Sequence, residues 1–424
     1  MDAVQETTNR IDDGATVSSN LNQRNVVTEL SLAELPNSTR TKLYDLNDDC
    51  LLEIFSSNSL SQEDLCSLAE TCRRFKKLTQ LVFSKEFDIK GLRFDFQSRN
   101  MIRDDETTTY RILKNFGSGL TTLSICGVGP VVNSVSKYCE AGTLKRLEFR
   151  SINVADSFAV ALKPIFQKLH TLHITYAPIE CSENVFVNCD SLTELEITST
   201  PNCSAILKNT FPNLKRFSIG RSERFQDYFS LADLDEFTNS DTLFTFIGRH
   251  GCLKVLTLNA GCVYRNCNFT DVIGKSCTGL EELTLRNFYS YDSPSKFTQL
   301  QGLTKLRMLD IDVRLINPKQ FKSILTALKS LETVKLSRMC MFDVGIVHVL
   351  PSLSKLKNLR ELHLIKCRRG IAIASNHPIS WTMLSQLKKI HITESNSVSR
   401  YSTAEILNQL TNLEELVVDN VRIK

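Results

Sequence analysis

Positively charged and imidazole side chains recur at one position near the C-terminal end of the sequence. Lys335, His363 and His391 each stand at the same place in successive copies of a short motif, Leu-x-x-Leu-x-Leu. Such a column favours carboxylates and phosphates, because charge-assisted hydrogen bonds to these groups are strong. The predicted binding set for an acidic or phosphorylated partner is completed by three neighbouring residues: Arg338, Lys366 and Lys389.

The same column can also be interpreted as a solvated basic rim. Residues 301–424 hold nineteen Lys and Arg against ten Asp and Glu, although the whole chain has a net charge of only +4. This local excess would increase solubility without any partner. Like charges stacked on neighbouring strands nevertheless cost energy when nothing neutralises them, which favours a partner. The sequence leaves both interpretations open.

The motif that positions these residues fills the last three quarters of the chain. Successive copies are about 27 residues apart on average, within the ~20–29 residues of a leucine-rich repeat. The pattern predicts an α/β solenoid, with parallel strands on its concave face and helices on its convex face. About twelve copies begin at Leu120, Leu144, Leu169, Leu192, Leu214, Leu253, Leu280, Leu306, Leu331, Leu359, Leu387 and Leu413.

Each repeat should bury three positions and expose the residues between them. In the copy that begins at Leu331, Val334 and Leu336 are expected to point inward and Lys335 outward, because strand side chains alternate. The connections look helical: residues 157–168 form an amphipathic pattern, and Asn317-Pro318 is typical of a helix start. Residues 402–405, Ser-Thr-Ala-Glu, predict a second helix start through a capping box.

The two ends and one interruption of the array depart from this pattern. A divergent repeat at residues 85–119, with a motif at 89–94 and a helix from Asp105 to Phe116, is expected to cap the first strand. The chain stops at Lys424, which predicts an open edge. The step from Leu214 to Leu253 is 39 residues. Its extra segment, residues 221–239, is either a covering insertion or a partner-binding loop.

Other chemistries find no support in the sequence. It contains no phosphate-binding glycine loop, no Gly-x-Ser-x-Gly and no His-Glu-x-x-His. The fourteen cysteines form no Cys-x-x-Cys pair, and basic residues lack the interleaved aromatics of nucleic-acid surfaces. We therefore expect a non-enzymatic protein with no cofactor, no metal and no nucleic-acid partner.

The compartment is predicted from what the chain lacks. No apolar run reaches the ~18 residues of a membrane helix, and residues 1–40 do not resemble a signal peptide. Their polar composition indicates a disordered tail. Together with scattered cysteines, this predicts a reduced compartment, cytoplasmic or nuclear, and no membrane partner.

A different texture precedes the repeats, in residues 43–83. Asn47 or Asp48 should begin one short helix and Ser61 or Gln62 a second, both with apolar faces. About forty residues so rich in Leu and Phe cannot bury them all internally. An exposed apolar patch on so small a unit marks a partner site.

This segment resembles an F-box, at residues 41–84. The matching residues are Leu46, Asp48, Leu51, Leu52, Glu53, Ile54, Phe55, Asp64, Leu65, Ala69, Cys72, Arg73, Phe75 and Leu78. Three features depart from the family pattern: Asn47 replaces a usual Pro, Phe75 replaces a frequent Trp, and about two extra residues lie between Phe55 and Leu60. With residues 120–424 as the solenoid, the chain is similar to the F-box/leucine-rich-repeat family.

The resemblance implies a non-catalytic role in ubiquitin ligation. The F-box would dock on the Skp-type adaptor, and through it on the cullin and RING subunits, while the repeats hold an unknown protein substrate. The implied adaptor-binding residues are Leu46, Leu51, Leu52, Ile54, Phe55, Leu60, Leu65, Leu68, Cys72 and Phe75. The alternative is a non-degradative interaction scaffold. A third class, a secreted repeat receptor, is disfavoured by the missing signal peptide.

Overall fold

The computed structural model describes residues 42–57, 59–95, 106–127, 131–220, 240–259, 269–286, 294–312, 318–338, 349–366, 380–393 and 400–424. The chain divides by its internal contacts into two compact units, Met1–Leu51 and Leu52–Lys424. None of the described helices is both long and apolar enough to cross a membrane.

The first unit contains the 3-10 helix η1 (Leu43–Asp45) and the start of helix α1 (Asp48–Phe55). The side chain of Asn47 accepts a hydrogen bond from the Cys50 amide at 2.8 Å. Asn47 therefore caps α1, as the sequence predicts, and occupies the position where a proline is usual without disturbing the helix start.

Two further helices follow α1 in the second unit, α2 (Gln62–Thr71) and α3 (Arg73–Lys90). Ser61 caps α2 through a reciprocal pair: the Asp64 amide donates to the Ser61 hydroxyl at 3.2 Å, and the Ser61 amide donates to Asp64 at 2.8 Å. The predicted start of the second helix is thus confirmed. Phe55 packs edge-to-face on Phe75 of α3, with ring centroids 5.2 Å apart.

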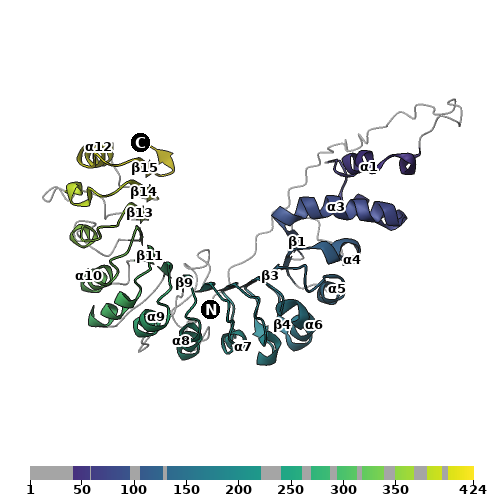
Figure 1. The fold of residues 1–424 in the computed structure, drawn as a ribbon, viewed down its shortest axis with the longest axis horizontal. Coiled ribbons are helices and arrows are strands. Elements are labelled where there is room, and N and C mark those ends of the chain that lie inside the picture. The colour runs from purple at the N-terminus through teal and green to yellow at the C-terminus, as the bar shows by residue number, and fades with distance from the viewer. Residues whose placement is uncertain are drawn as a thin grey trace, which may run out of the picture. The chain divides into compact units, whose positions relative to one another are not determined.

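One sheet of fourteen strands runs through the described repeats in chain order (Figure 1). All pairings are parallel except the last. Within residues 52–424 the strands line the inner side of a curve and the helices its outer side. The strands are β1 (Leu92–Asp95), β2 (Thr122–Cys126), β3 (Arg146–Arg150), β5 (Thr171–Thr175), β7 (Glu194–Thr198), β8 (Arg216–Gly220), β9 (Val255–Asn259), β10 (Glu282–Arg286), β11 (Met308–Asp312), β12 (Thr333–Ser337), β13 (Glu361–Ile365), β14 (Lys389–Thr393), β15 (Glu415–Val418) and β16 (Val421–Arg422).

The register of the sheet follows the motif. Lys335 pairs with His363, and His363 pairs with His391, so the predicted column exists. The long step after Leu214 leaves the ladder intact, because Ser218 of β8 pairs directly with Thr257 of β9. Residues 221–239 lie outside the described residues, so both interpretations of that segment stay open.

The core is a stack of the three apolar positions of each motif. Leu331, Val334 and Leu336 are fully buried, as predicted, and their counterparts along the array are buried too, except Val418 in the last repeat, which is partly exposed. Each buried leucine contributes about 1.5–3 kcal/mol relative to an exposed one. This repeated burial holds the outward residues at fixed places on the strand face.

A left-handed residue terminates several strands. Ser151, Tyr176, Ser199, Arg338 and Lys366 all have φ between 49° and 56°. Their amides continue the ladder; Arg338, for example, donates to the Ile365 carbonyl at 2.8 Å. The strained backbone costs about 1–2 kcal/mol per residue, and these hydrogen bonds offset part of that cost.

The crossovers are α-helices or 3-10 turns. Two short strands, β4 (Val154–Ala155) and β6 (Ile179–Glu180), pair in a second sheet on the crossover side. The helical elements of the repeats are α4 (Glu106–Phe116), η2 (Gly117–Gly119), α5 (Val131–Tyr138), α6 (Asp156–Phe166), η3 (Glu183–Phe186), α7 (Ser204–Leu207), α8 (Ser240–Arg249), α9 (Phe269–Ser276), η6 (Pro294–Gly302), α10 (Pro318–Ala327), α11 (Leu350–Leu353), η9 (Trp381–Leu384) and α12 (Arg400–Gln409).

Most sequence predictions about these elements are confirmed, and two are wrong. Helix α6 lies where residues 157–168 predict one, and α10 begins at Pro318. The predicted capping box at 402–405 is wrong, because α12 begins at Arg400 and burial of Ile406 and Leu410 fixes the helix instead.

The predicted open C-terminal edge is also wrong. Strand β16 folds back antiparallel on β15, and the Ile423 amide donates to the Leu416 carbonyl at 2.7 Å. This short return covers part of the last strand. At the other end, β1 and α4 form the divergent first repeat that the sequence suggests.

Candidate functional site

The predicted adaptor-binding residues separate by burial into two groups. Phe55, Leu65 and Phe75 are at most 7% exposed, so they pack within the helices of the second unit and offer little surface to a partner. Leu51 of the first unit is also buried. The others are partly or fully exposed: Leu46 in the first unit, and Leu52, Ile54, Leu60, Leu68 and Cys72 in the second.

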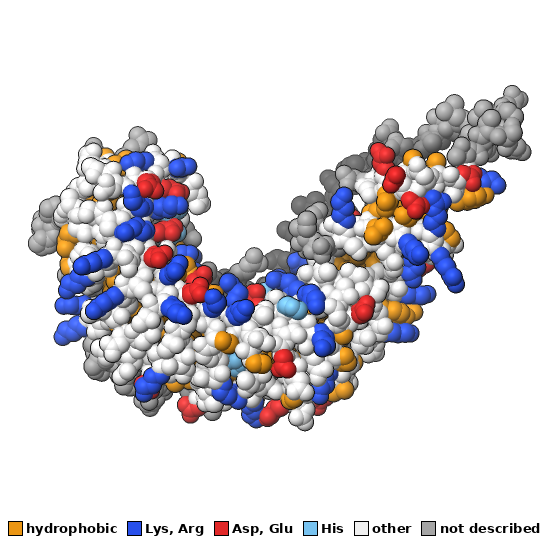
Figure 2. Space-filling model, in the orientation of Figure 1, with side chains coloured by type: hydrophobic (Ala, Val, Ile, Leu, Met, Phe, Trp, Pro, Cys, Tyr) orange, Lys and Arg blue, Asp and Glu red, His pale blue; other side chains and the backbone are white. Residues whose placement is uncertain are grey.

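We call the five residues of the second unit the helical patch; Ile54 and Cys72 are exposed, and Leu52, Leu60 and Leu68 are partly exposed. Ile54 is 41% exposed, and Leu81 of α3, which the sequence reasoning missed, is 60% exposed. Leu81 could have been found, because Phe75, Leu78 and Val82 are the buried positions of α3 and residue 81 falls off that stripe. Figure 2 shows hydrophobic side chains exposed over these helices.

A polar network joins α2 to the first repeat. Arg111 of α4 donates two hydrogen bonds to the Glu70 carboxylate, at 2.7 and 3.2 Å, and Asn115 donates a third at 3.0 Å. The hydrogen bond from Arg111 is the main reason that the pKa of Glu70 lies below its usual value, although slight burial opposes it. A bidentate pair of this kind fixes orientation as well as contact.

An apolar contact joins α3 to the same repeat. Phe83 stacks on Phe116 of α4, with centroids 4.2 Å apart and planes 10° from parallel. Gln80 donates to the Asn115 carbonyl at 2.8 Å. Helices α2 and α3 are thereby packed onto the first repeat and are not held by a linker alone.

The strand face carries the second predicted set. Lys335, His363 and His391 lie side by side on β12, β13 and β14, and the two imidazole rings stack 4.5 Å apart. Arg338 and Lys366 follow β12 and β13, and Lys389 begins β14. The structure therefore brings the six residues to adjacent strands; whether they bind a substrate stays a prediction.

Acidic residues interleave with these bases, which the sequence reasoning missed. Glu361 Oε1 lies 2.8 Å from His363 Nε2, and Glu415 Oε2 lies 3.3 Å from Lys389 Nζ. The face is thus more balanced than a purely basic column; Figure 2 shows blue and red side chains alternating along the inner side of the C-terminal repeats. Both acids stand two residues before an outward residue, so strand alternation could have placed them.

Burial is the main cause that lowers the pKa of His363, and the charges of His391 and Lys335 lower it further against the opposing effect of Glu361. Burial alone would raise the pKa of Glu361, but the hydrogen bond and charge of His363 outweigh it and bring the pKa below its usual value. At neutral pH the pair therefore consists of a neutral imidazole and a carboxylate.

Two buried aspartates lie beside this cluster, on β11. Arg286 pairs with Asp310 at 2.7 Å and Arg338 with Asp312 at 3.2 Å, and the aspartates are 4% and 1% exposed. Removing Arg286 would leave the buried charge of Asp310 uncompensated, and removing Arg338 would take a charged partner from Asp312; a loss of this kind costs more than the pair itself contributes. Arg338 therefore has a structural task besides its predicted binding role.

A second histidine cluster lies on the strand face nearer the N-terminus. His173 Nδ1 is 3.1 Å from Arg146 and 3.5 Å from Glu196, and its Nε2 is 3.2 Å from Glu194. Beside it is a shallow pocket of about 190 Å³, bordered by Glu194, Glu196, Arg216, Ser218, Val255 and Thr257. This cluster holds one imidazole, whereas the C-terminal one holds two.

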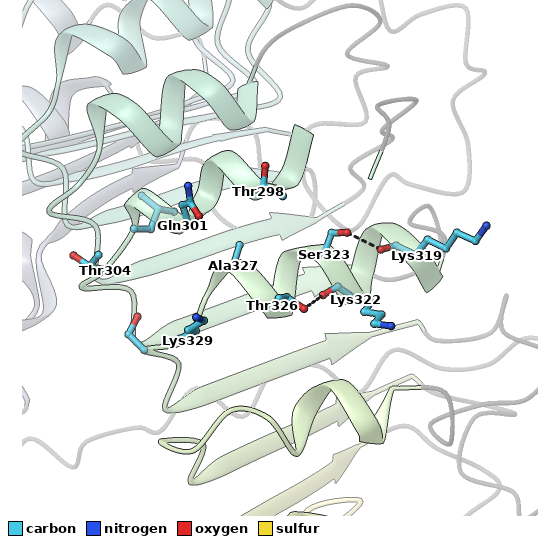
Figure 3. Close-up of a pocket in the computed structure, with 11 residues that line it drawn as sticks. Thr298, Gln301, Thr304, Lys319, Lys322, Ser323, Thr326, Ala327 and Lys329 are labelled. Atoms are coloured by element: carbon cyan, nitrogen blue, oxygen red, sulfur yellow. Dashed lines mark hydrogen bonds between the residues drawn. The ribbon is translucent and has the colours of Figure 1, made fainter. Parts of the chain in front are cut away.

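A hollow with a volume of about 850 Å³ lies on the helix side, between η6 and α10 (Figure 3). Its lysines, including Lys319 and Lys322, point outward, and the Ser323 and Thr326 hydroxyls donate to carbonyls of their own helix. Those hydroxyls are thus engaged within α10. We do not assign a function to this hollow.

The chain is similar to an F-box-like family model over residues 45–83. No curated protein matches it. Similar solved structures include an internalin from Listeria monocytogenes, with a TM-score of 0.41 and 15% identity, covering 73% of this chain and 82% of that one. A leucine-rich-repeat protein of Leptospira interrogans has a TM-score of 0.32 and 13% identity, covering 78% and 96%. LegL7 from Legionella pneumophila has a TM-score of 0.38 and 14% identity, covering 64% and 93%. The family match and the observed repeats support an F-box/leucine-rich-repeat organisation.

Proposed function

We propose that this chain is the substrate-recognition subunit of an SCF-type E3 ubiquitin ligase and is not itself catalytic. The observation that carries the proposal is the F-box-like match at residues 45–83, over helices that leave apolar side chains exposed. An exposed apolar patch on a short helical segment suits a groove on a constant partner, here the Skp-type adaptor. The adaptor would in turn bring the cullin and RING subunits, in the cytoplasm or nucleus.

The junction with the first repeat supports the same proposal. Transfer of ubiquitin requires a bound substrate to be held at a defined place relative to the ligase. The Glu70–Arg111 pair and the Phe83–Phe116 stack tie α2 and α3 to the repeats. A substrate on the strand face would therefore be held in a fixed orientation to those helices.

The strand face of the C-terminal repeats is the proposed substrate site. Its candidate contact residues are Lys335, Arg338, His363, Lys366, Lys389 and His391, to which the structure adds Glu361 and Glu415. Since bases and acids alternate there, we propose a partner segment that contains acidic or phosphorylated residues together with basic ones.

The adaptor step is tested by direct binding of the purified Skp-type adaptor to the full chain. Ile54→Lys should weaken binding by at least about 10-fold, because it places a charge in a desolvated apolar contact. Val160→Lys is the matched control, since Val160 is also an exposed apolar residue on a helix, α6, at 58% exposure. Equal binding by both variants and the unaltered chain would refute the F-box assignment.

The ligase role is tested separately from adaptor binding. Proximity labelling with and without a proteasome inhibitor should reveal proteins that accumulate only when degradation is blocked, and only with an intact Ile54. Lys335→Glu with Lys389→Glu should reduce their labelling, and these two sites avoid the buried pair of Arg338. Partners whose turnover is independent of the cullin would instead favour a non-degradative scaffold.

A further inference from the structure

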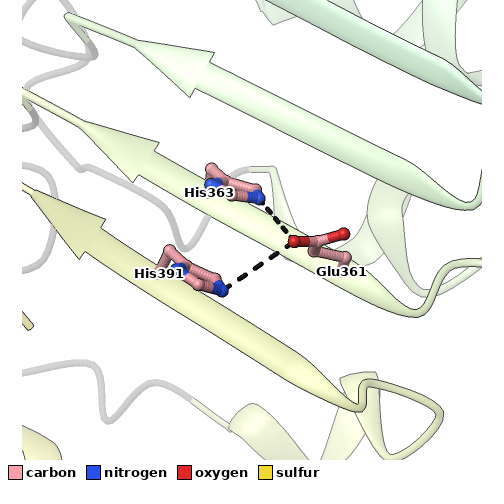
Figure 4. Close-up of side chains that lie close together, drawn as sticks. All are labelled: Glu361, His363 and His391. Carbon is pink, nitrogen blue, oxygen red and sulfur yellow. Dashed lines mark hydrogen bonds and ion pairs between the residues drawn. The ribbon is translucent and has the colours of Figure 1, made fainter. Parts of the chain in front are cut away.

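Three potential metal ligands converge on strands β13 and β14 (Figure 4). Glu361 and His363 stand two residues apart on β13, so both side chains leave the same face, and His391 lies directly opposite His363 on β14. Glu361 Oε1 is 2.8 Å from Nε2 of His363 and 3.8 Å from Nε2 of His391. One ligand atom from each residue lies within 4.8 Å of the other two.

These separations suit a small cation. Zinc bonds of about 2.0–2.2 Å place the ligands of a tetrahedral site about 3.3 Å apart. The two observed contacts to Glu361 lie on either side of that value. Both Nε2 atoms face Oε1 of Glu361, but the imidazole planes are only 11° from parallel. Each ring must therefore turn about its χ angles for the two Nε2 lone pairs to converge on an ion.

The surroundings orient the ligands. The Thr333 hydroxyl donates to the second Glu361 oxygen at 3.3 Å, which leaves Oε1 directed at the imidazoles. Such an outer contact is a usual support for a carboxylate ligand. The side chains of His363 and His391 are 19% and 23% exposed, so an ion from solvent can reach them.

Charge at the site is mixed. Lys335 from β12 and Lys389 from β14 disfavour a cation, whereas Glu415 from β15, 3.9 Å from His391, favours one. Lys389 is itself paired with Glu415 at 3.3 Å.

We propose that Glu361, His363 and His391 bind a divalent transition-metal cation of the zinc class on the strand face. Two imidazoles and one carboxylate are a donor set that zinc accepts, with a fourth position left to water or to a ligand from a bound partner. Metal binding by the chain alone requires neither the adaptor nor a substrate, although Glu361, His363 and His391 are also candidate substrate contacts.

The test uses the full chain with Zn²⁺ alone, by isothermal titration calorimetry, and with Co²⁺ as a spectroscopic probe. We expect one site and a tetrahedral Co²⁺ spectrum without thiolate-to-cobalt charge transfer. His363→Ala and His391→Ala should each weaken binding by more than about 100-fold, since even outer-shell substitutions cost about 10–100-fold. Glu361→Gln should weaken it less.

His173→Ala is the matched control, because His173 also contacts two glutamates on the strand face but has no second imidazole. This variant should bind Zn²⁺ normally. Unchanged stoichiometry and affinity in the His363 and His391 variants would overturn the proposal, and so would a thiolate spectrum, which would place the metal on cysteines. Zn²⁺ should also raise the melting temperature of the unaltered chain but not of a folded His391→Ala variant.

Discussion

Helices α1–α3 and the strand face of the C-terminal repeats expose different types of side chain to a partner. Helices α1–α3 expose large apolar side chains, such as Ile54 and Leu81. On β12–β15 they are charged or imidazole groups, most of them beside a group of opposite charge. Apolar burial gives affinity that salt and pH hardly change, whereas paired charges give specificity that both can change. The difference fits one constant and one variable partner.

The largest effect on stability is expected where α3 packs onto the first repeat. Phe83 is 1% exposed and stacks on Phe116, so Phe83→Ala should lower the free energy of unfolding by about 3–5 kcal/mol. Guanidinium denaturation of the full chain measures this value. Leu81→Ala, on the same helix but 60% exposed, should change it by less than about 0.5 kcal/mol. Equal effects would mean that α3 is not packed onto the repeats.

Substitutions of exposed and buried residues of α1 should have different and smaller effects. Ile54→Ala should weaken adaptor binding by about 10-fold while leaving stability nearly unchanged, because Ile54 is 41% exposed. Phe55→Ala should instead lower stability, because Phe55 is 1% exposed and packs on Phe75. The affinity of the unaltered chain should hardly vary between low and high salt. A steep salt dependence would show that charges, and not the helical patch, bind the adaptor.

The strand face and the helices also differ in how much of their structure the sequence predicts. The motif period predicts the strands, their register and the column from Lys335 to His391, because alternation along a strand is a local property. The F-box resemblance at residues 41–84 supplies candidate binding residues but not which of them are buried, since burial of Phe55 and Phe75 depends on contacts between helices. Glu361 also points outward, two residues before His363, but the motif does not mark this position as charged. The return of β16 depends on pairing with β15 and has no motif of its own.

Acidification should affect the repeats but not α1–α3, because all seven histidines lie between residues 170 and 391. Buried His250 accepts the Phe211 amide at Nε2 and contacts the Phe246 carbonyl through Nδ1. Burial is the main reason that its pKa lies below the usual value, as it is for His363.

The unfolded chain therefore binds more protons below about pH 6.5, and stability should fall as the pH falls, by at most about 1.4 kcal/mol per pH unit for each histidine. Denaturation at pH 7.5, 6.5 and 5.5 measures the slope. His363→Gln should make this slope shallower. Adaptor affinity should stay constant from pH 7.5 to 6, and a parallel decline would contradict the separation of the two surfaces.

The smallest effect concerns a single ion pair of the strand face. Lys389 and Glu415 lie 3.3 Å apart with side chains 48% and 24% exposed. A double-mutant cycle with Lys389→Met and Glu415→Gln, in a chelating buffer, should give a coupling of about 0.2–1 kcal/mol that shrinks with added salt. With a coupling this weak, Lys389 or Glu415 can leave the other and contact a substrate group at little cost in free energy. A coupling well above that range would make the face a structural network, too costly to open for a partner.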